Sequence, residues 1–307
     1  MSGTTATEKW SRRMSRKNWE MLACSPHSST NVYIYVPQPL LLLDTRNKMA
    51  VFLCFLFFLI SSATACERCV HQTKAAYFNP ASALSSGACG YGSLALGFNS
   101  ELLAGGVASL YNDGAGCGAC FQIRCKNKTL CTGKGTRVIL TDRNDNNQLD
   151  FVLSIKAFTA MALQGMSQHV LDQGIVDVEY KRIPCKYGNR NLTVRVEELS
   201  QKPRYLAVKF MYQGGQTEIV GVDVAQVGSS NWVSMSRNYG AIWDTGRVPS
   251  GPLQFRFLVT AGYDGKWVWA QHVLPADWNL GAIYDSGVQI TGIAQEACSP
   301  CDKGTWK

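Results

Sequence analysis

The segment Asp142–Asp150 gathers carboxylate and amide side chains that could bind a cation or transfer protons. Its first, third and fifth positions supply oxygen atoms in the spacing that a calcium loop uses. Such a loop needs a glycine at position six and a glutamate at position twelve, where this chain has Asn147 and Leu153. We therefore expect a polar loop that holds no metal ion, with Asp142 and Asp150 left as candidate acids.

Twelve cysteines form the second chemically active set, and only four histidines accompany them. No two histidines are close in sequence, so a mixed cysteine–histidine zinc site is not expected. This many cysteines indicates an oxidising compartment unless they bind metal or do redox chemistry. The pairs Cys66/Cys69 and Cys298/Cys301 have zinc-ligand spacing, but secretion favours disulfides there. No metal and no cofactor is expected.

An unbroken apolar run of eleven residues, 50–60, is too short to span a bilayer. Arg46 and Lys48 precede it, and the small residues 63–65 follow it. A basic flank, a short apolar run and a small-residue exit are the parts of a secretory signal. We therefore expect a signal peptide at 49–65 and a secreted, extracellular mature protein that no longer contains a membrane segment.

Residues 1–48 precede Met49, which stands where a signal peptide would begin. We expect them to be an over-extended gene model or a dispensable leader, with a transit peptide as the alternative. Removing 1–65 lowers the formal net charge from +8 to +4. Because the remaining charge is spread thinly, no nucleic-acid partner is expected.

The cysteines of the mature chain are distributed unevenly, since six fall between 89 and 185 and none between 186 and 297. This distribution predicts a disulfide-bonded first domain at 66–185 and a disulfide-free second domain at 191–285. Residues 186–190 form the expected linker, and 286–307 form a cysteine-containing tail. The sequons at Asn127 and Asn191 are expected glycosylation sites on exposed loops.

Short runs of β-branched and aromatic residues dominate both domains. They predict strands at 136–141, 175–180, 192–197, 206–212, 219–224, 253–259 and 266–270. The regular spacing of the later strands indicates a β-sandwich. The one helix expected covers 155–163, with Ser154 as its N-cap. The fold class is therefore all-β.

Glycine-rich and cysteine-rich motifs follow one another in the first domain: Gly87–Gly92, Gly114–Cys120, Cys125, Cys131, Thr141-Asp142 and Arg182–Cys185. The second domain adds two tryptophan-containing motifs, Trp232–Trp243 and Leu274–Trp278. With these motifs the sequence resembles the plant expansin family over residues 70–285. The CxxC pairs at the two ends of the mature chain resemble the expansin-like A subfamily in particular.

This resemblance implies a six-stranded double-psi β-barrel, similar to that of an inverting endoglucanase family, followed by an immunoglobulin-like β-sandwich that binds carbohydrate. It also implies three disulfides: Cys89 with Cys117, Cys120 with Cys185, and Cys125 with Cys131. The pairing of the four terminal cysteines stays open between bonds that tie the two ends together and two local bridges.

The resemblance also bears on catalysis, because inverting hydrolysis needs two carboxyl groups about 6.5–9.5 Å apart. Asp142 matches the aspartate of the family's Thr-Asp motif, whereas Val152 stands where the family has an acid-like aspartate. Asp150 faces the same side of the strand as position 152 but is displaced by about 6–7 Å. Tyr77 is what remains of a Thr-Trp-Tyr motif. We expect no catalysis, and a vestigial groove of Tyr77, Asp142 and Asp150, although Asp142 has loop capping as an equal alternative.

Flat aromatic side chains stack on the C–H faces of sugar rings. Tyr205 and Tyr239 match two positions of the family's aromatic strip, while Leu206 replaces an aromatic residue that is common there. Trp243 is expected either to extend this polysaccharide-binding strip or to belong to the core. The other three tryptophans of the strand patterns, Trp232, Trp267 and Trp269, are expected in the core, with the last two facing the same side.

We therefore expect a monomeric cell-wall protein that binds cellulose or hemicellulose and loosens the wall without hydrolysis. One alternative is a weak glycoside hydrolase that uses Asp142 with Asp150. The other is a structural or defence-related wall protein that has lost the loosening activity.

Overall fold

The computed structural model describes residues 70–78, 81–146, 148–261, 265–291 and 293. The expected leader, the signal peptide and the four terminal cysteines lie outside these residues. Within them, no helix is long and apolar enough to cross a membrane.

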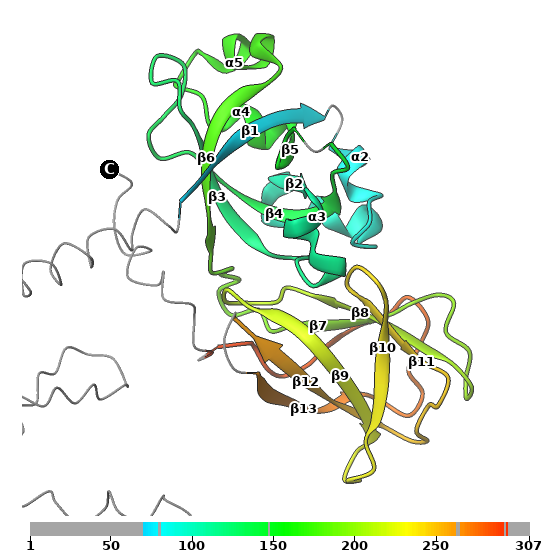
Figure 1. Cartoon of the computed structure of the whole chain (residues 1–307). Coiled ribbons are helices and arrows are strands. Elements are labelled where there is room, and N and C mark those ends of the chain that lie inside the picture. Colours follow the sequence, from blue (N-terminus) through cyan, green and yellow to red (C-terminus); the bar gives the residue numbers. More distant parts are fainter. Residues whose placement is uncertain (1–69, 79–80, 147, 262–264, 292, 294–307) are drawn as a thin grey trace, which may run out of the picture. The chain divides into compact units, whose positions relative to one another are not determined.

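Six strands of the first domain close into a barrel in the order β1-β5-β2-β4-β3-β6 (Figure 1). Their bounds are β1 His71–Phe78, β2 Leu103–Gly106, β3 Cys120–Cys125, β4 Thr136–Arg143, β5 Phe151–Ser154 and β6 Val176–Ile183. The parallel pairs β1–β5 and β2–β4 alternate with antiparallel ones. The strands predicted at 136–141 and 175–180 are confirmed as β4 and β6, and so is the barrel.

Aromatic rings fill the inside of the barrel, where Phe121, Phe151 and Tyr180 meet edge to face. The apolar residues of these strands form one core cluster, and the short strands β2 and β5 are buried at every residue. The short helical segments between strands are α2 Ser82–Ser85, η3 Gly92–Gly97, η4 Asn99–Glu101, α3 Ala108–Tyr111 and η5 Asn112–Gly114.

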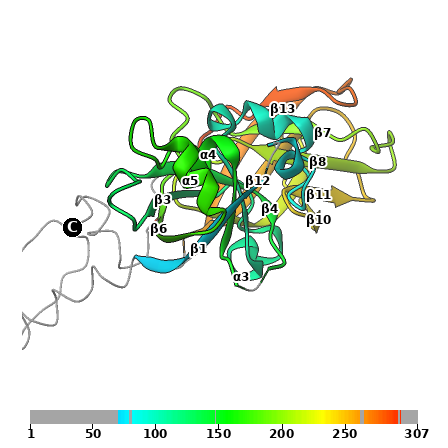
Figure 2. The same cartoon turned by 90° about the horizontal axis from the view of Figure 1, so that it is seen from above.

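Helices α4 (Ile155–Thr159) and α5 (Ser167–Gln173) pack side by side, as Figure 2 shows. The Ser154 side chain accepts a hydrogen bond from the Ala157 N–H, which confirms the predicted N-cap. The helix ends earlier than predicted because the backbone of 161–163 pairs with residues 130–132, where Leu163 N–H donates to Leu130 O at 2.8 Å.

Three disulfides hold the first domain: Cys89–Cys117, Cys120–Cys185 and Cys125–Cys131. They are the three pairs that the family resemblance implied. The loop between Cys125 and Cys131 exposes Asn127, whose carbonyl oxygen accepts from Thr129 N–H and Oγ1. The second sequon, Asn191-Leu192-Thr193, is less exposed than expected. Asn191 is half-buried, and the hydroxyl of Thr193, the first residue of the second domain's first strand, is buried.

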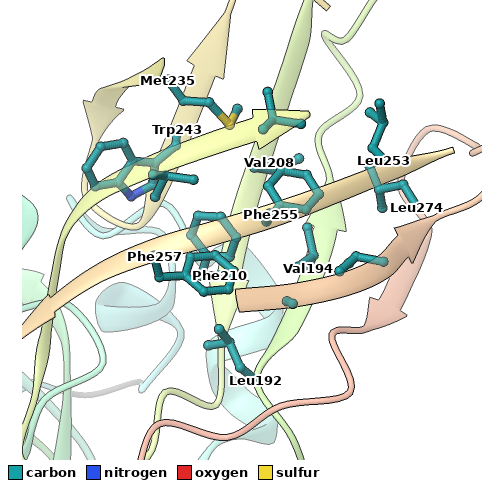
Figure 3. Close-up of a cluster of buried hydrophobic side chains, with 14 of the residues drawn as sticks. Leu192, Val194, Val208, Phe210, Met235, Trp243, Leu253, Phe255, Phe257 and Leu274 are labelled. Carbon is teal, nitrogen blue, oxygen red and sulfur yellow. The ribbon is translucent and has the colours of Figure 1, made fainter. Parts of the chain in front are cut away.

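Eight strands form the second domain, in the order β13-β12-β9-β10-β11-β8-β7-β14. Their bounds are β7 Thr193–Val196, β8 Leu206–Met211, β9 Glu218–Gln226, β10 Val233–Tyr239, β11 Ile242–Thr245, β12 Leu253–Thr260, β13 Lys266–Leu274 and β14 Ile283–Asp285. Both halves of this sheet turn apolar residues into one core, in which Phe210, Phe255 and Phe257 lie together (Figure 3). The five strands predicted here are confirmed, and the all-β class with them.

A third apolar cluster contains residues of both domains, including Tyr91 and Phe98 from the first and Met211 and Ala241 from the second. Arg237 joins the two domains by hydrogen bonds, because its guanidinium donates to Gly114 O at 3.2 Å and Gly240 O at 2.5 Å. This packing holds the loop around Gly114 of the first domain against strand β10 of the second.

Candidate functional site

Strand pairing aligns four residues across the barrel, Ala76 of β1, Val152 of β5, Gly105 of β2 and Asp142 of β4. Neighbouring strands lie about 4.8 Å apart, so the backbones of Val152 and Asp142, two strands apart, are separated by roughly 9.6 Å. This backbone separation is close to the upper end of the about 6.5–9.5 Å that separates the two carboxyl groups of an inverting glycosidase. Because residue 152 is a buried valine, the row contains one carboxylate, that of Asp142.

Asp142 has a structural task in this row. Its Oδ1 atom accepts hydrogen bonds from Ala88 N–H and Arg143 N–H, both at 2.7 Å. A Cβ atom at Gly87 would lie 1.9 Å from Asp142 Cγ, so only glycine lets the loop approach the carboxylate this closely. This geometry agrees with the loop-capping alternative for Asp142.

Asp150 lies just before β5 and has a different partner. Its backbone N–H donates to Thr73 Oγ1 at 3.3 Å, and its carboxylate lies near the phenol of Tyr180 on β6. Burial, followed by the charge and hydrogen bond of Asp150, raises the pKa of Tyr180 well above its ordinary value. The two aspartates are therefore held by separate sets of contacts.

Tyr77 faces away from the Asp142 row. It pairs with Leu153, one residue past the Ala76–Val152 pair, so its side chain points to the opposite face of β1. Its ring packs on Phe158 with centroids 4.9 Å apart, and its hydroxyl donates to Leu171 O at 3.5 Å. The predicted groove of Tyr77, Asp142 and Asp150 is thus not assembled as one site.

The second domain holds a polar network around Asp244. The Tyr205 hydroxyl donates to Asp244 Oδ2 at 2.7 Å, and Asn238 Nδ2 donates to the same oxygen at 2.6 Å. Partial burial and the hydrogen bond to Asp244 raise the pKa of Tyr205, so the phenol stays a neutral donor. The neighbour of Asn238 is Tyr239, whose side chain is 48% exposed.

The glycine-rich loop 87–92 connects the two regions. A Cβ atom at Gly90 would lie 2.8 Å from Tyr239 Cε2, so the Tyr239 ring rests against this loop. The same loop contacts Asp142 through Gly87 and Ala88. Tyr239 and the Asp142 row therefore meet around this loop. Asn238, next to Tyr239 in the chain, shares Asp244 Oδ2 with Tyr205. We call the surface made of this loop, Tyr239, Tyr205 and Asp244 the loop-87 face. Among the described residues, no group of three or more His, Cys, Asp or Glu side chains is placed to hold a metal ion.

Comparison with known proteins identifies the family. A family model described as "Expansin C-terminal domain" matches residues 192–275, and one described as "Lytic transglycolase" matches residues 103–180. Expansin-like A2 of Arabidopsis thaliana is 62% identical over 248 residues, which cover 80% of this chain and 94% of the relative. The chain belongs to the expansin-like proteins.

Other comparisons agree with this assignment. Expansin-like A1 of Arabidopsis thaliana is 60% identical over 83% of this chain and 98% of its own length, and Expansin-like A3 of Oryza sativa subsp. japonica is 48% identical over 80% and 91%. The crystal structure of apo Clavibacter michiganensis expansin shares the fold, with a TM-score of 0.56 and 20% identity over 73% of this chain and 100% of that chain. A second crystal structure is of a mutant of that expansin in complex with cellohexaose, also with a TM-score of 0.56.

One residue assigned to the aromatic strip of this expansin-like protein is placed differently by the structure. Trp243 is 5% exposed and lies in the core of the second domain beside Met235 (Figure 3). Its other side is covered by the guanidinium of Arg237, 4.4 Å from the ring. Trp243 therefore has no free face for a sugar, and its assignment to the strip was wrong. Leu206 is also fully buried in this core.

The three tryptophans that were expected in the core are more exposed than predicted. Trp269 is 51% exposed, and Trp232 and Trp267 are half-buried rather than part of the core. Sequence reasoning missed these surface side chains because β13 carries apolar residues on both faces, so its pattern does not tell inside from outside. It also missed the roles of Asn238, which lies within the motif Trp232–Trp243, and of Asp244, which directly follows it.

Proposed function

We propose that this expansin-like protein is a secreted, extracellular protein of the plant cell wall that binds a neutral glucan on the loop-87 face without hydrolysing it. The observation that carries the proposal is the half-exposed ring of Tyr239, which follows Asn238 in the chain, while Asn238 and Tyr205 both donate to Asp244. A half-exposed ring beside hydrogen-bonding groups suits a sugar, because the ring contacts C–H groups and the polar atoms contact hydroxyls. The cellohexaose complex of a protein with the same fold supports this ligand class.

The absence of hydrolysis is proposed from the barrel row. Acid–base hydrolysis needs one group that protonates the leaving oxygen and one that activates water. Val152 has no proton to give, and Oδ1 of Asp142 already accepts two backbone hydrogen bonds. Asp150, which the hydrolase alternative requires, lies near the phenol of Tyr180, whose pKa it helps to raise.

The binding proposal is tested by replacing the two tyrosines. We expect Tyr205→Ala/Tyr239→Ala to weaken binding to crystalline cellulose or xyloglucan by about tenfold or more, because each ring contributes on the order of 1 kcal/mol. Depletion isotherms with purified polymers measure this. The matched control is Tyr205→Phe, which keeps the ring, loses the hydrogen bond to Asp244, and should retain most of the binding. Unchanged binding by the double alanine variant would place the site elsewhere.

The non-hydrolytic proposal is tested with the same polymers. We expect isolated walls under load to extend when the wild-type protein is added, with no release of reducing ends. Release that Asp142→Asn abolishes, while Asp145→Asn in the same loop leaves it unchanged, would contradict the proposal. Binding without extension would instead favour the structural or defence-related alternative.

A further inference from the structure

Three tryptophans gather on the outer face of strands β13, β12 and β9. The register pairs Trp269 of β13 with Arg256 of β12, and Arg256 with Asp223 of β9. Trp267 lies two residues before Trp269 on the same side, and Trp232 precedes β10 at the other edge. We call this surface, made of Trp232, Trp267, Trp269, Arg256 and Asp223, the tryptophan platform.

Arg256 organises the platform. Its guanidinium lies 4.6 Å from the Trp232 ring and 4.5 Å from the Trp267 ring, so both indoles are held in cation–π contact. Arg256 also forms a salt bridge with Asp223 at 2.7 Å. The Ser234 hydroxyl donates to the other carboxylate oxygen of Asp223 at 2.7 Å. The indoles of Trp232 and Trp267 are thus held in place by Arg256.

The exposed part of the platform is formed mainly by Trp269, which is 51% exposed. Trp269 and Trp267 project from one face of β13, about 6.8 Å apart along the strand. Next to Trp267 lies Leu258, whose other neighbour across the sheet is Gly221. A Cβ atom at Gly221 would lie 3.2 Å from Leu258 Cβ, so the Leu258 side chain covers this glycine and borders the platform beside Trp267.

The platform lies on the other side of the core from the loop-87 face. On β12, Phe255 and Phe257 point into the core, so Arg256 between them points outward. On β11, Trp243 points into the same core, so Asp244, which holds Tyr205, points outward from the opposite half of the sheet. The two aromatic surfaces therefore face away from each other.

The charges and polarity of the platform indicate what it binds. Arg256 is neutralised by Asp223, and the exposed neighbour Lys266 adds a single positive charge, which is little for an acidic polymer, a nucleic acid or an anionic membrane. The exposed neighbours Ser234, Ser236 and Lys266 are hydrophilic, unlike the apolar interior of a stable dimer interface. Rigid indoles beside a hydrogen-bonded Arg–Asp pair match a neutral sugar chain, with C–H faces on the rings and hydroxyls on the charged pair.

We propose that the tryptophan platform is a second binding surface for a neutral polysaccharide chain. This inference rests on the proposed function, because it assigns the same ligand class to a separate face. With two sugar-binding surfaces on opposite sides of its second domain, one molecule bridges two polysaccharide chains. The protein then acts as a cross-link between neighbouring chains as well as a ligand of each.

The test uses the full mature chain with two measurements, binding to xyloglucan and cellulose and the stiffness of a cellulose nanofibril suspension. We expect Trp269→Ala to weaken the second class of sites in the binding isotherm by about tenfold and to abolish stiffening. Because Trp269 is exposed, this change should leave the melting temperature nearly unchanged. Trp269→Phe keeps an aromatic face and should restore most of both signals.

The outcomes separate this inference from the proposal on which it rests. If Trp269→Ala binds and stiffens like wild type while Tyr205→Ala/Tyr239→Ala loses binding, the platform is not a sugar site and the loop-87 face still is. If wild-type protein binds neither polymer, the proposed function itself fails. A concentration-dependent dimer that Trp269→Ala dissociates in sedimentation would assign the platform to self-association and overturn the inference.

Discussion

Removal of the Cys120–Cys185 disulfide should lower the free energy of unfolding by about 4 kcal/mol, which is the largest single effect that we expect. The bond joins the start of β3 to the residues after β6, two strands that are paired in the barrel. It closes a loop with a sequence separation of 65 residues. A cross-link lowers the conformational entropy of the unfolded chain, and the effect grows with the length of the loop that it closes. Of the three disulfides, this one closes the longest loop and should therefore have the largest effect.

Urea unfolding of Cys120→Ala/Cys185→Ala measures this effect. The matched control is Cys125→Ala/Cys131→Ala, which removes two buried cysteines from a loop with a separation of 6. Its expected loss is about 2 kcal/mol, and the Cys89–Cys117 pair, with a separation of 28, should fall between them. Equal losses for the three pairs would show that loop closure is not the main contribution.

Gly240→Ala should lower the free energy of unfolding by about 3 kcal/mol. Gly240 has a φ of 51°, in the left-handed region where a side chain is strained. A Cβ atom there would lie 2.5 Å from the Ala88 carbonyl oxygen and from the Cα atom of Cys89. These are backbone atoms of the first domain, held by the hydrogen bond from Ala241 N–H to Cys89 O at 3.1 Å, so they cannot move aside easily.

Gly228→Ala is the control that separates strain from the clash. Gly228 also has a positive φ, of 80°, but a Cβ atom added there would have no neighbour within 4 Å. Only the conformational cost remains, about 1 kcal/mol. Thermal unfolding of both variants measures the difference. A Gly240→Ala protein no less stable than Gly228→Ala would mean that the two domains separate at little cost. In that case Gly240→Ala should also weaken glucan binding, since Tyr239 would lose its contact with Gly90.

Much of the fold follows from local patterns in the sequence. Strands such as 253–259 show enough β-branched and aromatic residues to be located within one or two residues of β12. Ser154 precedes a short amphipathic run, and it caps α4 as expected. The end of α4 was placed too late because pairing of 161–163 with residues 130–132 is a contact between segments distant in sequence.

The candidate site followed from the sequence only in part. The motif Gly87–Gly92 indicated close backbone approaches, and Tyr239 was found by its family motif. The partners that give each aspartate its role could not be found in this way. Asp142 contacts a loop more than fifty residues earlier, and Asp150 contacts Tyr180 on another strand. These partners come together only when the barrel closes, and the spacing of residues along the chain does not predict which distant residues then meet.

By itself, the sequence determined the family, the all-β class, the sites of half of the strands and the presence of a valine at position 152. These properties depend on residue type and local order, which chain folding does not alter. Only the tertiary structure decided which aromatic faces are free: Trp243 is enclosed by the core and Arg237, while Trp269 stands in solvent. The physical reason is that both strands carry apolar residues on both sides. The other half of the sheet packs against one side of each strand, and that side becomes the interior.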